Sequence, residues 1–87
     1  MVVIKKKVWP EFFERILEGK KKFELRLNDS DVNEGDILLL EEWNPKTKQY
    51  TGRKIEKKVS YLIMTKDVKF WSKEEIDKYG FVILSLE

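Results

Sequence analysis

The sequence contains no cysteine, no histidine and no alanine. Without cysteine, the chain cannot form a disulfide framework, use a thiolate nucleophile or bind zinc through sulfur. Without histidine, it has no imidazole base near neutral pH and cannot build a Ser-His-Asp triad. Any catalysis would therefore rest on lysine, aspartate, glutamate, tyrosine, serine or threonine side chains.

Long apolar runs are also missing. A strictly apolar stretch such as Ile37–Leu40 is far shorter than the ~20 residues that a membrane span requires. The first residues, Met1 to Lys7, lack the apolar core of a signal peptide and instead indicate a strand. The 87 residues, 41% of them hydrophobic, suffice for one domain over 1–87. We expect a cytoplasmic monomer that needs no cofactor and does not associate with a membrane.

Charged residues make up 39% of the chain, well above the usual quarter. A surface rich in lysine and glutamate, a single glutamine and the lack of cysteine together resemble the composition of hyperthermophile proteins. The composition therefore predicts a thermostable domain. A melting midpoint in the range of ordinary mesophile domains would contradict this prediction.

The net charge of +2 is unevenly distributed along the sequence. Residues 44–58 carry six lysines and arginines and only one acid. Such a segment is a candidate phosphate-binding surface, with Arg53, Lys54, Lys57 and Lys58 as the contacts. The other interpretation is a solvated hairpin whose lysines keep an edge strand from pairing with other chains.

Apolar residues recur at helical spacing around Pro10. The stripe consists of Trp9, Phe12, Phe13, Ile16 and Leu17. Proline is well suited to the first turn of a helix, and Gly19 offers the left-handed conformation that ends one. The pattern predicts a short helix between Pro10 and Gly19. We expect its apolar stripe, Trp9 included, to enter the core.

Strands are predicted wherever apolar and polar residues alternate or an apolar run is bounded by turn residues. They cover Val2–Val8, Lys20–Leu27, Ile37–Trp43, Arg53–Met64 and Phe81–Leu86. A second short helix is predicted over Ser72–Lys78, because Ser72 and Glu75 have the spacing of a capping box. This order of elements favours an α+β fold, a small curled sheet or barrel capped by one or two short helices.

The segment Gly19–Arg26, which reads GKKKFELR, holds the candidate site. Glu24 and Arg26 lie two residues apart, on one face of the predicted strand. They can therefore pair, or hold a planar polar ligand together through charge-assisted hydrogen bonds. Lys21 has the opposite parity and reaches that face only if the chain still turns after Gly19. The competing interpretation is an exposed Glu–Arg pair, which contributes about 0–1 kcal/mol to stability.

The pattern G-x-K-x-x-E-x-R, formed by Gly19, Lys21, Glu24 and Arg26, resembles the signature of the ASCH superfamily. The resemblance covers essentially the whole chain and is nearest to the small stand-alone members of that superfamily. It implies a PUA-like pseudo-barrel of five to six strands with one or two short helices. It also implies that Lys21, Glu24 and Arg26 line a cleft suited to a nucleobase or nucleotide.

This resemblance and the charge pattern together predict an RNA- or nucleotide-binding module. The expected binding residues are Lys20, Lys21, Lys22, Glu24, Arg26, Arg53, Lys54, Lys57 and Trp71. Trp71 is included because Lys69 and Lys73 flank it, and a tryptophan that stacks on a base contributes about 1–3 kcal/mol to binding. No metal site is expected.

An alternative is a small amidohydrolase or other hydrolase that acts on a modified nucleoside or on RNA. Small ASCH enzymes that hydrolyse acetylated cytidine use a lysine and a threonine of this motif. Lys21 matches their lysine, whereas Glu24 occupies the position of their threonine. In this alternative Lys21 is the catalytic base and Glu24 the acid. A third interpretation is a protein-binding domain whose charged cleft is incidental.

Overall fold

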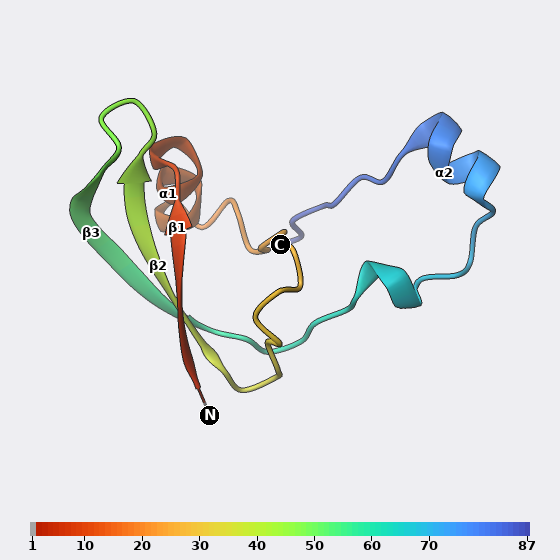
Figure 1. The fold of residues 1–87 in the computed structure, drawn as a ribbon, viewed down its shortest axis with the longest axis horizontal. Coiled ribbons are helices and arrows are strands. Elements are labelled where there is room, and N and C mark those ends of the chain that lie inside the picture. Colours follow the sequence, from red (N-terminus) through yellow and green to blue (C-terminus); the bar gives the residue numbers. More distant parts are fainter. Residues whose placement is uncertain (1) are drawn as a thin grey trace.

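A three-stranded sheet with one helix packed on it forms one end of the computed structural model, which describes residues 2–87 (Figure 1). The elements are β1 (Val3–Val8), α1 (Pro10–Leu17), β2 (Ile37–Asn44), β3 (Gln49–Lys58), a 3-10 turn (Thr65–Asp67) and α2 (Lys73–Tyr79). The structure confirms β1, both helices and the apolar strand that became β2. It also confirms the capping box, because the Ser72 hydroxyl accepts from Glu75 N while the Glu75 carboxylate accepts from Ser72 N.

β2 lies in the middle of the sheet, parallel to β1 and antiparallel to β3. Ile37 of β2 is paired with Val3 of β1 on one side and with Lys58 of β3 on the other. An irregularity between Glu41 and Trp43 interrupts the second pairing. The path from β1 through α1 to β2 is thus a βαβ unit, followed by a hairpin.

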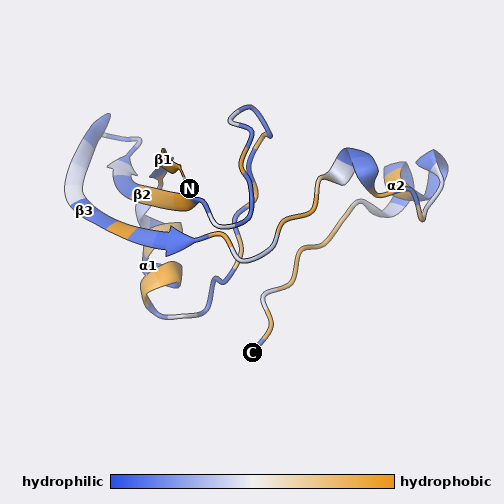
Figure 2. Ribbon diagram, turned by 90° about the horizontal axis from the view of Figure 1, so that it is seen from below, coloured by the Kyte–Doolittle hydropathy of each residue, from blue (hydrophilic) through white to orange (hydrophobic). Residues whose placement is uncertain are grey.

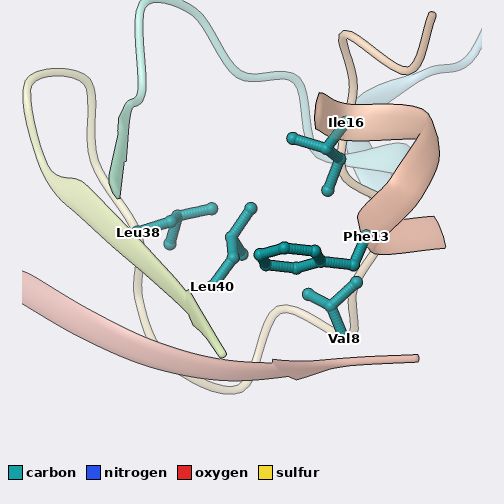
Figure 3. Packing of buried hydrophobic residues seen from close by; sticks show 5 residues of the cluster. All are labelled: Val8, Phe13, Ile16, Leu38 and Leu40. Atoms are coloured by element: carbon teal, nitrogen blue, oxygen red, sulfur yellow. The ribbon is translucent and has the colours of Figure 1, made fainter. Parts of the chain in front are cut away.

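The core lies between α1 and the sheet (Figure 3). It consists of Val8, Phe13, Ile16, Leu38 and Leu40. Alternate residues of β2 point toward the helix, and Phe13 packs between Val8 and Leu40. This core is small because one short helix covers only a narrow part of the sheet. Burial of these five side chains fixes the position of α1, and therefore of the segment that follows it.

The loop that leads into β2 is anchored by Asp36, whose side chain is buried. One carboxylate oxygen accepts from the Val2 amide at 3.0 Å and the other from the Asn33 amide at 2.9 Å. These backbone donors, Asn33 first, hold the pKa of Asp36 below its ordinary value. Gly35, immediately before it, has a φ of +91°, a conformation that glycine adopts without steric cost.

The structure confirms a small α+β fold but not the predicted pseudo-barrel of five to six strands, because the sheet is open and has three paired strands among residues 2–87. The segments Lys20–Leu27 and Phe81–Leu86, both expected as strands, run without a strand ladder in this part of the chain. They meet where the Lys22 amide donates to Ser85 Oγ at 3.0 Å. Alternating side chains indicate that a segment has two different faces, but they do not supply the neighbouring strand that a ladder needs.

The boundaries of the last sheet strand also differ from those expected. Arg53–Met64 was predicted, whereas β3 runs over Gln49–Lys58 and leaves only a short turn after Asn44. The Lys48 amide closes that turn by donating to the Asn44 carbonyl at 2.8 Å. The basic residues of 44–58 therefore lie mostly along a paired strand and not on a long hairpin tip.

Residues 59–87 are called here the C-terminal arm. Its first residue, Val59, is still bonded to Gly35 and Asp36, and the chain then leaves the sheet and carries α2 far from it (Figure 1). Many of its apolar side chains are exposed, and the apolar segments stand out along the arm (Figure 2). The Cα radius of gyration is 14.8 Å, whereas a globular chain of this length has about 12 Å. No helix within residues 2–87 is both long enough and apolar enough to cross a membrane.

Candidate functional site

A tight turn after α1 positions the motif. Gly19 has a φ of +77°, and its amide donates to the Ile16 carbonyl, which ends the helix. The amides of Lys20 and Lys21 then both donate to the Arg15 carbonyl at 3.0 Å. The chain therefore still turns at Lys21, which the sequence left open, and its side chain reaches the same site as Glu24.

Lys21, Glu24 and Arg26 form one continuous polar chain. Lys21 Nζ donates to Glu24 Oε1 at 2.6 Å and to the Phe23 carbonyl at 2.8 Å. Arg26 Nε donates to the other carboxylate oxygen, Glu24 Oε2, at 2.8 Å. The side chains of Lys21 and Glu24 are only 15% and 18% exposed. The carboxylate is therefore fixed from both sides by two cations.

Arg26 also connects the motif to the sheet, since its Nη2 donates to the Lys7 carbonyl at 2.7 Å. This contact places the motif beside the end of β1 and the start of α1. Between them lies a pocket of about 590 Å³, lined mainly by apolar groups. It is lined by Lys7, Val8, Trp9, Phe12, Arg15, Lys20, Lys21, Phe23, Glu24, Leu25 and Arg26. We call it the motif pocket.

Trp9 and Phe12 line this pocket as exposed aromatic side chains. The prediction that Trp9 enters the core is wrong, because 49% of its surface is exposed, and Phe12 is 45% exposed. Their ring centroids are 6.5 Å apart with an interplanar angle of 25°. The narrow sheet covers only Phe13 and Ile16 of the helical stripe, so the flanking aromatics remain accessible. The sequence pattern identified these residues but not their exposure.

Lys20 also lies at the motif pocket, where its ammonium is 3.6 Å from Glu18 Oε2. Lys22 is exposed and does not line the pocket, and its backbone amide donates to Ser85 Oγ. Trp71 belongs to the C-terminal arm, where it makes edge contacts with Phe70 and Phe81. Of the expected binding residues, the structure thus brings together Lys20, Lys21, Glu24 and Arg26.

Arg53 lies on β3, in a second charged cluster outside the motif pocket. Its Nε and Nη2 donate to Glu42 at 2.9 and 2.7 Å, and Nη2 also donates to Glu14. The guanidinium, which was expected to bind phosphate, thus connects β3, β2 and α1. Lys54 and Lys57 are exposed on the same strand, also away from the pocket.

Glu42 is the buried acid of this cluster, with 3% of its surface exposed. Hydrogen bonds from Arg53, and then from the Thr51 hydroxyl, hold its pKa below the ordinary value, although burial acts in the opposite direction. The hydrogen bonds that Arg53 donates, first to Glu42 and then to Glu14, raise the pKa of Arg53. Because its donors and acceptors satisfy one another, this cluster secures α1 to the hairpin.

Comparison with known proteins identifies a family and a similar curated protein. The family described as "Domain of unknown function (DUF3850)" matches residues 4–86 of the chain. An "Uncharacterized 12.9 kDa protein in GpA 3'region" of Escherichia phage P2 is 39% identical over 54 residues. The aligned part is 62% of this chain and spans about half, 48%, of that relative. Because the family match covers nearly the whole sequence, the chain belongs to the DUF3850 family.

Proposed function

We propose that this protein is an ASCH-type module that binds RNA or a nucleotide and holds one nucleobase in the motif pocket. The observation that carries the proposal is the position of the Glu24 carboxylate. It is fixed between two cations on the wall of a pocket that also presents the exposed rings of Trp9 and Phe12. Exposed aromatic rings beside an oriented polar group match the two requirements of base recognition, stacking and edge hydrogen bonding.

Glu24 would recognise hydrogen-bond donors on the edge of the base. Each carboxylate oxygen has two lone-pair positions, and each accepts one protein hydrogen bond, from Lys21 or from Arg26. One position per oxygen therefore remains for a ligand. An ionised carboxylate accepts but does not donate, so it favours the amino groups of cytosine, adenine and guanine. We expect these nucleosides to bind more tightly than uridine.

The cations around the pocket would contact the sugar-phosphate backbone. Arg15 and Lys20 line its mouth, more than half of each side chain being exposed. Their exposure matters, because a phosphate must reach them without a large rearrangement. Lys54 and Lys57 lie on β3 outside the pocket. They would contact only a strand long enough to extend beyond it.

The alternative is hydrolysis of a modified nucleoside or of RNA, and one observation favours it. Lys21 and Glu24 are in direct contact in a mainly apolar pocket, an arrangement in which a proton can pass between them. However, Lys21 donates to two acceptors and serves to position Glu24, so binding is the function that this geometry supports better. Turnover that disappears in Lys21→Ala while binding persists would establish the hydrolase.

The decisive experiment is chemical-shift mapping on labelled protein. The titrants are the four nucleosides, acetylated cytidine and a short single-stranded RNA, each at two salt concentrations. We expect shifts centred on Trp9 and on residues 20–26, which persist at the higher salt concentration for the nucleosides. Shifts confined to residues 44–58 that vanish at high salt would contradict the proposal. New substrate signals in the same tube would reveal turnover.

Arg26→Ala and Arg26→Lys test the site independently of the map. Both variants lose the guanidinium that bridges the Glu24 carboxylate and the Lys7 carbonyl, but Arg26→Lys keeps the positive charge. We expect weaker nucleoside binding in both variants, with circular dichroism like that of wild type. Unchanged affinity in a folded Arg26→Ala variant would remove Arg26 from the site.

A further inference from the structure

A second, smaller pocket adjoins the motif pocket. It has a volume of about 340 Å³ and is lined by Lys6, Leu25, Arg26, Leu27 and Asp29. Leu25 and Arg26 line both pockets, so these two side chains form the boundary between them. A ligand seated in the motif pocket therefore has a second cavity directly beyond Arg26.

Two cations in this second pocket retain unused hydrogen-bond donors. Arg26 uses Nε and Nη2, so Nη1 has no protein acceptor among the residues that the structure describes. Lys6 Nζ donates to Ser30 Oγ at 2.6 Å and to Asp29 Oδ1 at 3.4 Å, which leaves one of its three protons. The Lys6 side chain is only 19% exposed, so its ammonium is held near the pocket wall.

Asp29 is the anion of the second pocket, and it is only weakly bound to Lys6. Its side chain is 66% exposed, and its contact with Lys6 is long. The Ser30 hydroxyl and then Lys6 hold the pKa of Asp29 below its ordinary value, so it is ionised at neutral pH. An exposed ion pair of this kind contributes little to stability and readily exchanges partners. An incoming phosphate group can therefore take the place of Asp29 beside Lys6.

We infer that the second pocket is a subsite for the phosphodiester group attached to the nucleotide in the motif pocket. Lys6 and Arg26 contact the phosphate, and Arg26 also fixes the base-recognising Glu24 on its other side. The natural ligand accordingly carries a phosphate group, as a nucleotide or a strand of nucleotides does, and is not a free nucleoside. This inference rests on the proposed function and assigns the ligand class for the same site.

The test compares ligands that differ by one phosphate group. Dissociation constants are measured by calorimetry for the four nucleosides, their 3′- and 5′-monophosphates, the corresponding dinucleotides and inorganic phosphate. For at least one phosphate position, we expect a gain in affinity of about tenfold over the nucleoside, as charge-assisted contacts from two cations would give. We expect inorganic phosphate alone to bind much more weakly than the nucleotides.

Variants then test whether the second pocket causes this gain in affinity. Lys6→Met should remove most of the gain while the nucleoside constant stays within twofold of wild type, because Lys6 does not line the motif pocket. Lys6→Arg should keep the gain, and Asp29→Asn should increase it by removing the competing anion. Lys5→Met is the matched control, since it removes the same charge from a residue of β1 that lines neither pocket.

Specific results would overturn the inference. If nucleosides bind and a phosphate adds nothing, the subsite does not exist although the proposed function stands. If the gain persists in Lys6→Met, or falls equally in Lys5→Met, the phosphate is bound elsewhere or by net charge alone. Inorganic phosphate that binds as tightly as the nucleotides would show an independent anion site. If no nucleoside or nucleotide binds, the proposed function fails as well.

Discussion

Lys21 Nζ lies 2.6 Å from Glu24 Oε1, and less than a fifth of either side chain is exposed. The same ammonium donates to the carbonyl of Phe23, which lies between them in sequence. The lysine thereby holds both the carboxylate and the backbone that carries it. The orientation of the Glu24 carboxylate in the motif pocket thus depends on Lys21. We expect Glu24 to contact the ligand and Lys21 to act by positioning Glu24.

Glu24→Gln should weaken the binding of the amino-bearing nucleosides by about tenfold or more, because a hydrogen bond to a charged group contributes about 1.5–3 kcal/mol. Calorimetric titration of the folded variant measures this loss. Uridine, which offers fewer donors, should lose less affinity. Glu11→Gln removes an acid from the first turn of α1 that does not line the pocket. An equal loss in both variants would contradict the assignment of Glu24 to the site.

Trp9→Ala should weaken nucleoside binding by the contribution of stacking, about 1–3 kcal/mol. The melting midpoint should change little, because Trp9 is half exposed and lies outside the core. Quenching of tryptophan fluorescence on titration is the measurement. Trp71→Ala serves as the comparison, since that residue lies on the C-terminal arm. Retained quenching in Trp9→Ala and its loss in Trp71→Ala would place the binding surface on the arm.

Acid should destabilise the fold through its paired carboxylates. The folded-state pKa values of Glu42 and Asp36 lie below those of the free carboxyls, so these groups stabilise the fold fully above the unfolded pKa of about 4. That contribution is lost as the pH falls through the folded-state values. The free energy of unfolding should therefore be flat from about pH 8 to 5.5 and fall below about pH 4.5. Urea unfolding across this range measures it.

Glu42→Gln isolates one part of this pH dependence. At neutral pH the variant should lose about 1.5–3 kcal/mol of stability, the usual contribution of a hydrogen bond to a charged group. Its stability should also fall less steeply below pH 4.5, because one titrating group is gone. A wild-type slope in acid would show that Glu42 does not contribute to the transition.

RNA binding should weaken with salt in proportion to the number of phosphates neutralised, with a slope of about 0.7 per phosphate on a log–log plot for single strands. The double variant Lys54→Gln, Lys57→Gln should reduce that slope for a strand of about twelve nucleotides and leave nucleoside affinity unchanged. Fluorescence anisotropy over several salt concentrations measures the slope. Tight binding with a flat salt response would exclude phosphate contacts altogether.

Local patterns were predictable because the residues that determine them lie close together in the sequence. The helix after Pro10, its end near Gly19 and the capping box at Ser72 depend on neighbours within four residues. The strands expected over Lys20–Leu27 and Phe81–Leu86 failed for the opposite reason. A strand exists only with a partner, and nothing within either segment specifies one. The predicted pseudo-barrel of five to six strands depended on both of them.

The candidate site shows the same division. The pairing of Glu24 with Arg26 follows from a spacing of two residues, whereas the approach of Lys21 required the turn that the Arg15 carbonyl organises. The exposure of Trp9 could not be predicted, because it depends on the width of the sheet beneath α1. The burial of Glu42 could have been predicted from the sequence, because Glu42 has the same parity in β2 as the buried residues Leu38 and Leu40.

The backbone amides of the sheet and those of the C-terminal arm should differ in how long they are protected from hydrogen exchange with solvent. Amides at the centre of β2 open only when the sheet unfolds, whereas amides of the arm outside its short helices have few partners to protect them from solvent exchange. A protease should accordingly cut the arm first, in the stretch between β3 and α2. Every residue that lines the two pockets precedes Ser30, so the fragment left after such a cut keeps both pockets in one piece.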